Sequence, residues 1–227
     1  MAGRVLRNGL DILLLVAVTF GIAIALQAML VGALPDPEIW LRLLIPLAVL
    51  GAMWVLLRVR GQGWVTIGLS RPESIWKALG LGLAIAIFFF FLSLGLEAFG
   101  FERDLGGLRA GVGQGWPYLL AAVLYAFVGA GLYEEATFRG FVMQRTAAMF
   151  GEGRGAWITG ALVQAILFGL SHGHQGGLGM VYTGGIAFVL AAIFLASGRN
   201  LWPLVIGHAL YDASRFVYFY LQDSGTL

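Results

Sequence analysis

The sequence contains no cysteine, a single lysine and few charged residues of either sign. Without cysteine the chain has no disulfide, no thiolate metal ligand and no cysteine nucleophile, so one branch of protease chemistry is excluded. Charged residues make up 11% of the 227 residues against 59% apolar, and the mean hydropathy is +0.87. Soluble globular domains do not tolerate such a balance. The composition therefore indicates an integral membrane protein in contact with a lipid bilayer.

The basic residues, nearly all arginine, lie at the ends of apolar segments, where they orient a membrane protein. They do not indicate a nucleic-acid partner. They fall on alternate loops, at Arg4 and Arg7, at 58–77, at 145–154 and at Arg199. By the positive-inside rule we expect these loops and the N-terminus in the cytoplasm. Arginine far above lysine, with abundant alanine and glycine, suggests a bacterial protein of the inner membrane.

Uncharged stretches long enough to cross a bilayer recur along the chain. We expect an all-α, polytopic bundle of about seven transmembrane helices, within a range of about six to eight. The expected spans are 10–33, 41–58, 77–97, 116–137, 155–172, 179–197 and 201–221. Residues 138–150 extend the fourth helix or lie at the interface. We interpret 1–227 as one membrane domain with a catalytic core at about 115–221.

The stretch "LYEEATFRGF", Leu132 to Phe141, places three charges in an apolar segment. A charge near the bilayer centre costs at least about 2.5–3.5 kcal/mol, so its retention indicates function or a structural pair. Glu135 and Arg139 are four residues apart and share a helical face, which predicts an internal ion pair. Glu134 projects about 100° away on a regular helix, without a local partner. It is a candidate general base; alternatively, both glutamates are solvated at the membrane surface.

Histidines supply the other polar positions. His208 and Asp212, in "GHALYDASR", share a helical face, so the aspartate can accept a hydrogen bond and fix the tautomer of the ring. Alternatively, His208 is a packing hydrogen bonder. His172 ends the fifth span. His174 lies two residues later, where helical spacing would not put both rings on one face, and we interpret it as a loop residue.

A helical hairpin would bring these groups together. From Glu134 to the turn at 151–155 is about 17 residues, and from that turn to His172 is about 17 more. Because both arms rise equally per residue, the hairpin returns His172 to the height of Glu134. With His208 and Asp212 from a third helix, the sequence predicts a small polar cavity in which a base activates water and imidazoles hold it or stabilise an oxyanion.

Three motifs in order, "EEATFR" at 134–139, "FGLSH" at 168–172 and "HALYD" at 208–212, resemble the CPBP family. This family contains the CAAX prenyl endopeptidases and the bacteriocin-processing or immunity proteins, and is also called the ABI family. The resemblance implies an intramembrane glutamic endopeptidase without a metal cofactor. It implies that Glu134 is the base, that His172 and His208 bind water and the oxyanion, that Asp212 orients the site, and that Glu135 and Arg139 pair structurally. Asp212 stands where the prenyl endopeptidases commonly have asparagine.

Three functions compete. The first is a metal-independent glutamate protease acting on a membrane-inserted or lipid-proximal peptide. The second is a zinc hydrolase with a glutamate, His172, His208 and Asp212 as ligands, which the absence of H-E-x-x-H spacing disfavours. The third is a non-catalytic immunity or scaffold protein, or a transporter using the same charges as a proton site.

Overall fold

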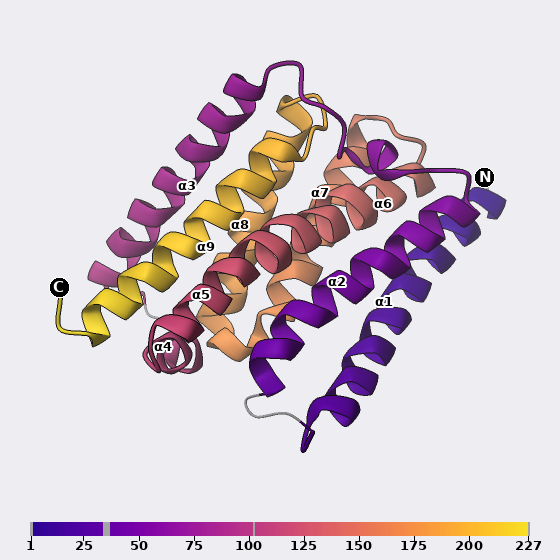
Figure 1. Cartoon of the computed structure of the whole chain (residues 1–227). Coiled ribbons are helices and arrows are strands. Elements are labelled where there is room, and N and C mark those ends of the chain that lie inside the picture. Colours follow the sequence, from indigo (N-terminus) through magenta and orange to yellow (C-terminus); the bar gives the residue numbers. More distant parts are fainter. Residues whose placement is uncertain (1, 34–36, 102, 227) are drawn as a thin grey trace.

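A computed structural model describes residues 2–33, 37–101 and 103–226, and every regular element in these ranges is helical (Figure 1). In chain order the elements are α1 (Ala2–Leu30), α2 (Pro37–Val59), η1 (Trp64–Ile67), α3 (Ile75–Ala98), α4 (Gly106–Val112), α5 (Trp116–Tyr125), η2 (Ala126–Glu134), η3 (Ala136–Met143), α6 (Gln144–Met149), α7 (Arg154–Ser171), η4 (Gly173–Gln175), α8 (Gly176–Ala196) and α9 (Trp202–Asp223). The all-α fold is as predicted.

Five helical segments of the described chain are long and apolar enough to cross a membrane, so the protein is multi-pass. They are Ala2–Leu30, Trp40–Val59, Ile75–Ala98, Trp116–Met149 and Gly173–Ala196. The expected spans at 155–172 and 201–221 are also helices, α7 and α9, but they fall outside this set. The reason in α9 is its polar residues: His208, Asp212 and Arg215 all turn toward an internal pocket rather than toward lipid.

The fourth span continues without a break through α5, η2, η3 and α6, so residues 138–149 extend this helix. Regular α-helical turns give way to wider π-helical turns over Ala126–Glu134 and again over Ala136–Met143. Such turns are rare and are frequently found at functional sites. Here they contain Glu134 and Arg139 and lie on either side of Glu135.

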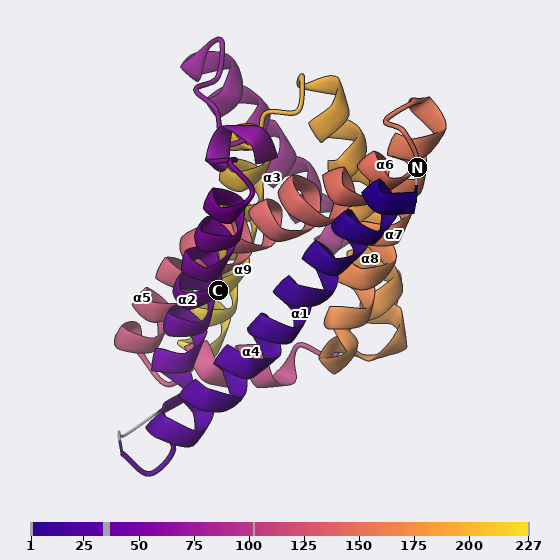
Figure 2. The same cartoon turned by 90° about the vertical axis from the view of Figure 1, so that its right-hand side faces the viewer.

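This long helix is the centre of the bundle. It packs against α2 on one side and α9 on the other, and α3 lies outside α9 (Figure 1). The hairpin partner α7 packs against η3 and α6, and α8 covers α7. Figure 2 shows α1 running along the side of the bundle, with its N-terminal end beside α6. Most of α1 faces outward, as expected for a helix surrounded by lipid.

Glycines set the close approach of α9 to its neighbours. A Cβ at Gly131 in η2 would lie 2.9 Å from the Cβ of Ala209, and one at Gly207 would lie 2.6 Å from Ile85 in α3. Small residues let the backbones of membrane helices come this close. His208 lies between Gly207 and Ala209, so the close packing of these two residues places its ring next to the two glutamates.

Candidate active site

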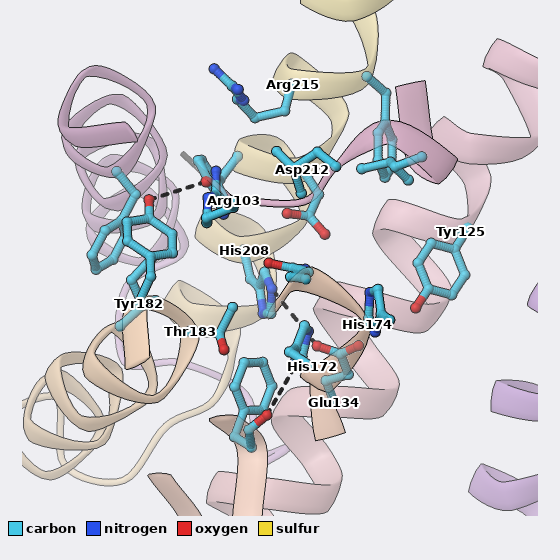
Figure 3. Close-up of a pocket in the computed structure, with 18 of the residues that line it drawn as sticks. Arg103, Tyr125, Glu134, His172, His174, Tyr182, Thr183, His208, Asp212 and Arg215 are labelled. Carbon is cyan, nitrogen blue, oxygen red and sulfur yellow. Dashed lines mark hydrogen bonds and ion pairs between the residues drawn. The ribbon is translucent and has the colours of Figure 1, made fainter. Parts of the chain in front are cut away.

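A cavity of about 410 Å³ opens between the long helix, α8, α9 and the ends of α7 and η4. Glu134, His172, His208 and Asp212 all line it (Figure 3). The hairpin prediction is therefore confirmed in its geometry: the carboxylate and the imidazoles of three separate helical segments reach one cavity. Glu134 itself is buried.

Glu135 holds two partners inside the protein. Its Oε1 accepts a hydrogen bond from Nη1 of Arg139 at 3.0 Å and another from Nδ1 of His208 at 2.8 Å. The side chains of Glu135 and Arg139 are both 0% exposed. The predicted ion pair is confirmed. The sequence did not show that the same carboxylate also binds His208 and, by accepting from Nδ1, directs Nε2 to the cavity.

The second nitrogen of His208 faces the other glutamate. Nε2 lies 3.8 Å from Oε2 of Glu134, and that oxygen is buried without a hydrogen-bond partner among the described residues. Adjacent glutamates thus contact one ring from two sides. On a regular helix they would diverge by about 100°, as the sequence led us to expect; the π-helical turns on either side of Glu135 allow both to reach α9.

The predicted hydrogen bond between His208 and Asp212 is wrong. Both ring nitrogens of His208 face the glutamates of the long helix, and Asp212 makes no hydrogen bond within the described chain. The four-residue spacing does place His208 and Asp212 on one face of the helix. The ring nitrogens, however, contact the carboxylates of Glu134 and Glu135, which pack against that face. Asp212 places its carboxyl group in the cavity wall instead (Figure 3).

His172 is fixed by the end of its own helix. Its Nδ1 lies 2.8 Å from the carbonyl oxygen of Phe168, and because a carbonyl only accepts, this nitrogen carries the proton and donates. The ring of Phe168 packs on His172 at 4.5 Å between centroids and lies 6.1 Å from the ring of His208. Phe168, the first residue of the second motif, therefore sets both the tautomer and the position of His172, leaving Nε2 as an acceptor.

His174 lies nearer to the site than we expected. The chain leaves α7 in the tight turn η4, and this turn brings the His174 ring to 5.7 Å from the ring of His172. Both line the cavity (Figure 3). The expectation of separate faces assumed a continuing α-helix, whereas the helix ends at Ser171.

Sequence reasoning missed two arginines in the cavity wall. Arg215 donates from Nη2 to Oε1 of Glu97 at 2.7 Å, and Arg103 lies 3.5 Å from the same oxygen and over the ring of Tyr182 at 4.1 Å. Arg215 is almost fully buried. A signal was available, because Arg215 is a third ionisable residue in the span that carries His208 and Asp212.

The zinc alternative would use the imidazoles and carboxylates of this same cavity as ligands. Within residues 2–33, 37–101 and 103–226, no group of three or more His, Asp or Glu side chains is placed to hold a metal ion. The Nδ1 atoms of His172 and His208 are engaged with Phe168 and Glu135. Histidines that bind zinc commonly donate their other ring nitrogen in this way, and Nε2 of both rings remains open, so metal analysis is the measurement that separates the two mechanisms.

The chain was compared with models of known protein families to test the resemblance carried by the three motifs. Residues 116–214 match the family model of the Type II CAAX prenyl endopeptidase Rce1-like proteins. The resemblance carried by the three motifs is thus confirmed, and all four cavity residues lie inside the matched segment. No curated protein and no solved structure matched the chain. The match supports an intramembrane protease, and the region before residue 116 lies outside it.

Proposed function

We propose that this protein is an intramembrane glutamic endopeptidase of bacterial type, with Glu134 as the base that activates water. The observation that carries the proposal is the unpaired Oε2 of Glu134, buried in a cavity and 3.8 Å from Nε2 of His208. A contact of this length suits a water shared by both groups. The match to a peptidase family supports the reaction class.

The proposed reaction starts with a proton transfer. Glu134 takes a proton from water while the water oxygen bonds to the carbonyl carbon of the peptide. Nε2 of His172, free to accept, holds the second hydrogen of the water. Nε2 of His208, when it carries a proton, donates to the oxyanion of the tetrahedral intermediate. The C–N bond then breaks and Glu134 returns its proton to the amine, which gives a carboxylic acid and an amine; transfer of the acid proton to the amine leaves a carboxylate and an ammonium group.

The remaining side chains act on these groups. Glu135 and Arg139 are positioning residues, because they hold Nδ1 of His208 and leave Nε2 facing the cavity. Asp212 lines the same cavity and can orient water or the peptide there through its carboxyl group. The cavity lies within a helical bundle, so we propose a membrane-inserted or lipid-proximal peptide as substrate, in a bacterial inner membrane with the N-terminus in the cytoplasm.

The decisive experiment compares purified wild type with Glu134→Gln on a library of membrane peptides. Glu73→Gln, an exposed glutamate outside the cavity, is the matched control. We expect cleavage by wild type and Glu73→Gln and its loss in Glu134→Gln. Full activity of Glu134→Gln would refute the proposed base. A wild type that cleaves nothing while Glu134→Gln loses a cellular phenotype would favour the non-catalytic or transport function.

Metal content separates the first proposal from the zinc alternative. We expect EDTA or phenanthroline to leave cleavage unchanged. Stoichiometric zinc in an active preparation, with activity lost on its removal and restored by zinc, would replace the glutamate-only mechanism with a zinc hydrolase.

A further inference from the structure

A second cavity, of about 150 Å³, lies at the turn end of the α6–α7 hairpin, away from the active-site cavity. The segment before η1, the start of α6, the beginning of α7 and the α8–α9 turn all contribute to it. Its lining includes five polar residues and one tryptophan: Gln62, Gln144, Arg145, Glu152, Arg199 and Trp157. None of them belongs to the proposed catalytic machinery.

Hydrogen-bond donors converge on this cavity from two segments, α6 and the α8–α9 turn. Nε2 of Gln144 is buried without a partner in the described chain. Arg145 is held in place, with Nη2 donating to Oε1 of Gln62 and Nε 3.5 Å from Oδ2 of Asp11. The guanidinium of Arg199 packs over the ring of Trp157 at 5.1 Å. A buried amide donor without an acceptor is unfavourable, so a ligand with acceptor oxygens would satisfy it.

The surroundings are strongly positive. This end of the bundle, which we call the arginine-rich end, gathers the N-terminus, the α2–α3 connection, the α6–α7 turn and the α8–α9 turn (Figure 1). Contacts such as Asn200 with Ser70 and Gln62 with Arg145 join these loops. Nine of the 14 basic residues lie here: Arg4, Arg7, Arg58, Arg60, Arg71, Lys77, Arg145, Arg154 and Arg199. The acidic residues at this end are three: Asp11, Glu73 and Glu152.

We propose that this cavity binds a phosphate group, either from an anionic lipid headgroup or as free phosphate. Arginine matches phosphate geometry through its planar fork of donors. The volume is below the roughly 300–1,000 Å³ of pockets for larger small molecules, which suits a single small anion. The cavity lies at helix ends, where a membrane protein meets headgroups and where basic residues attract anionic lipids. Glu152, the carboxylate in the lining, opposes the anion and tunes its affinity.

The test uses the full chain in lipid nanodiscs, with two arms that distinguish the sources of phosphate. One arm compares phosphatidylcholine with phosphatidylcholine plus phosphatidylglycerol. The other adds inorganic phosphate to phosphatidylcholine discs, with sodium chloride at equal ionic strength as its reference. The measurements are Tm and, by native mass spectrometry, the number of phosphatidylglycerol molecules retained. A ligand that binds only the folded state raises Tm. A response in either arm supports the proposal and names the source; no response in both overturns it.

Variants separate a defined site from diffuse attraction. Losing a charge-assisted hydrogen bond weakens binding by about tenfold or more, so Arg199→Gln should reduce apparent affinity by that factor. Gln144→Leu removes the unpaired donor, and should also weaken binding while leaving the unliganded protein folded. Glu152→Gln should tighten binding severalfold. Arg154→Gln, an exposed arginine at the same end but outside the cavity, is the control. Equal losses in Arg154→Gln and Arg199→Gln, or no gain in Glu152→Gln, would refute the site.

Discussion

Two buried carboxylates in this protein have opposite surroundings. Asp11 in α1 is 1% exposed, and its Oδ1 accepts from Nη2 of Arg60 at 2.5 Å and from Nε at 3.0 Å, while Arg145 approaches Oδ2. Glu134 is also buried and lines a cavity, yet its Oε2 has no hydrogen-bond partner in the part of the chain that the structure describes. A buried charge alone therefore does not identify a reaction site; a buried charge left unpaired beside a cavity does.

Glu135 lies between these extremes. Its Oε1 is paired with Arg139 and His208, and His208 belongs to the cavity, whereas its Oε2 is buried without a hydrogen-bond partner among the described residues. Its role is thus to hold a reacting group rather than to react. The adjacent glutamates have the same chemistry, and they differ in that Glu134 lines the cavity whereas Glu135 holds Arg139 and His208 through Oε1.

The largest effect should follow the loss of the paired cation. Arg139→Leu leaves Glu135 as an uncompensated buried charge, and breaking a buried pair this way destabilises by about 3–5 kcal/mol. We expect little folded protein, measured by monodisperse yield in detergent and by Tm. Arg154→Leu, at an exposed position, should express normally. Full yield of Arg139→Leu with a defect only in turnover would indicate that Arg139 contacts substrate instead.

Glu134→Gln should give the opposite result. The substitution keeps size and hydrogen bonding but removes basicity, so turnover should fall by about 10²-fold or more. Tm should stay within the error of wild type or rise, because no ion pair within hydrogen-bond distance is lost. Peptide cleavage and thermal unfolding on the same preparation provide the measurement. A fall in Tm matching the fall in activity would mean that the glutamate is structural.

The parts predictable from sequence were those that depend on local spacing. The Glu135–Arg139 pair follows from four-residue spacing on one helix, and the common height of Glu134 and His172 follows from equal rise on two arms of a hairpin. Apolar runs likewise located the helices. The family resemblance needed only the order and spacing of three motifs, and the family match confirmed it.

The parts that failed depend on helix geometry or on neighbours distant in sequence. The wide turns around Glu135 and the tight turn after Ser171 changed which side chains share a face. No local rule predicts that the ring of His208 meets Glu135 rather than Asp212, because that choice depends on how closely Gly207 and Gly131 let three helices pack. Seven spans were expected, whereas five helical segments of the described chain meet the hydropathy criterion. The polar residues of α9 lower its mean hydropathy, so this helix is not counted.

Asp11→Asn tests the paired member of the comparison. Neutralising Asp11 leaves Arg60 and Arg145 without their shared carboxylate, but Arg60 is 35% exposed and can turn to solvent. We therefore expect a loss of about 1–3 kcal/mol in unfolding free energy, seen as a lower Tm. Turnover per folded molecule should be unchanged, because the cluster lies at the arginine-rich end. A turnover defect without loss of Tm would show that this end communicates with the active site.

The smallest expected effect separates the two neighbouring histidines. His172 is held by the carbonyl of Phe168 and by its ring, whereas His174 is exposed and makes no hydrogen bond within the described chain. A group that is not held in position contributes little to an ordered transition state. His174→Ala should reduce kcat/KM by less than about tenfold, whereas His172→Ala should cost about 10²-fold or more. His174 lies at the cavity lining, so its loss should appear in KM rather than in kcat. Equal losses of kcat in the two variants would show that both imidazoles act on the water. The hydrogen bond that fixes His172 would then not be what identifies the catalytic histidine.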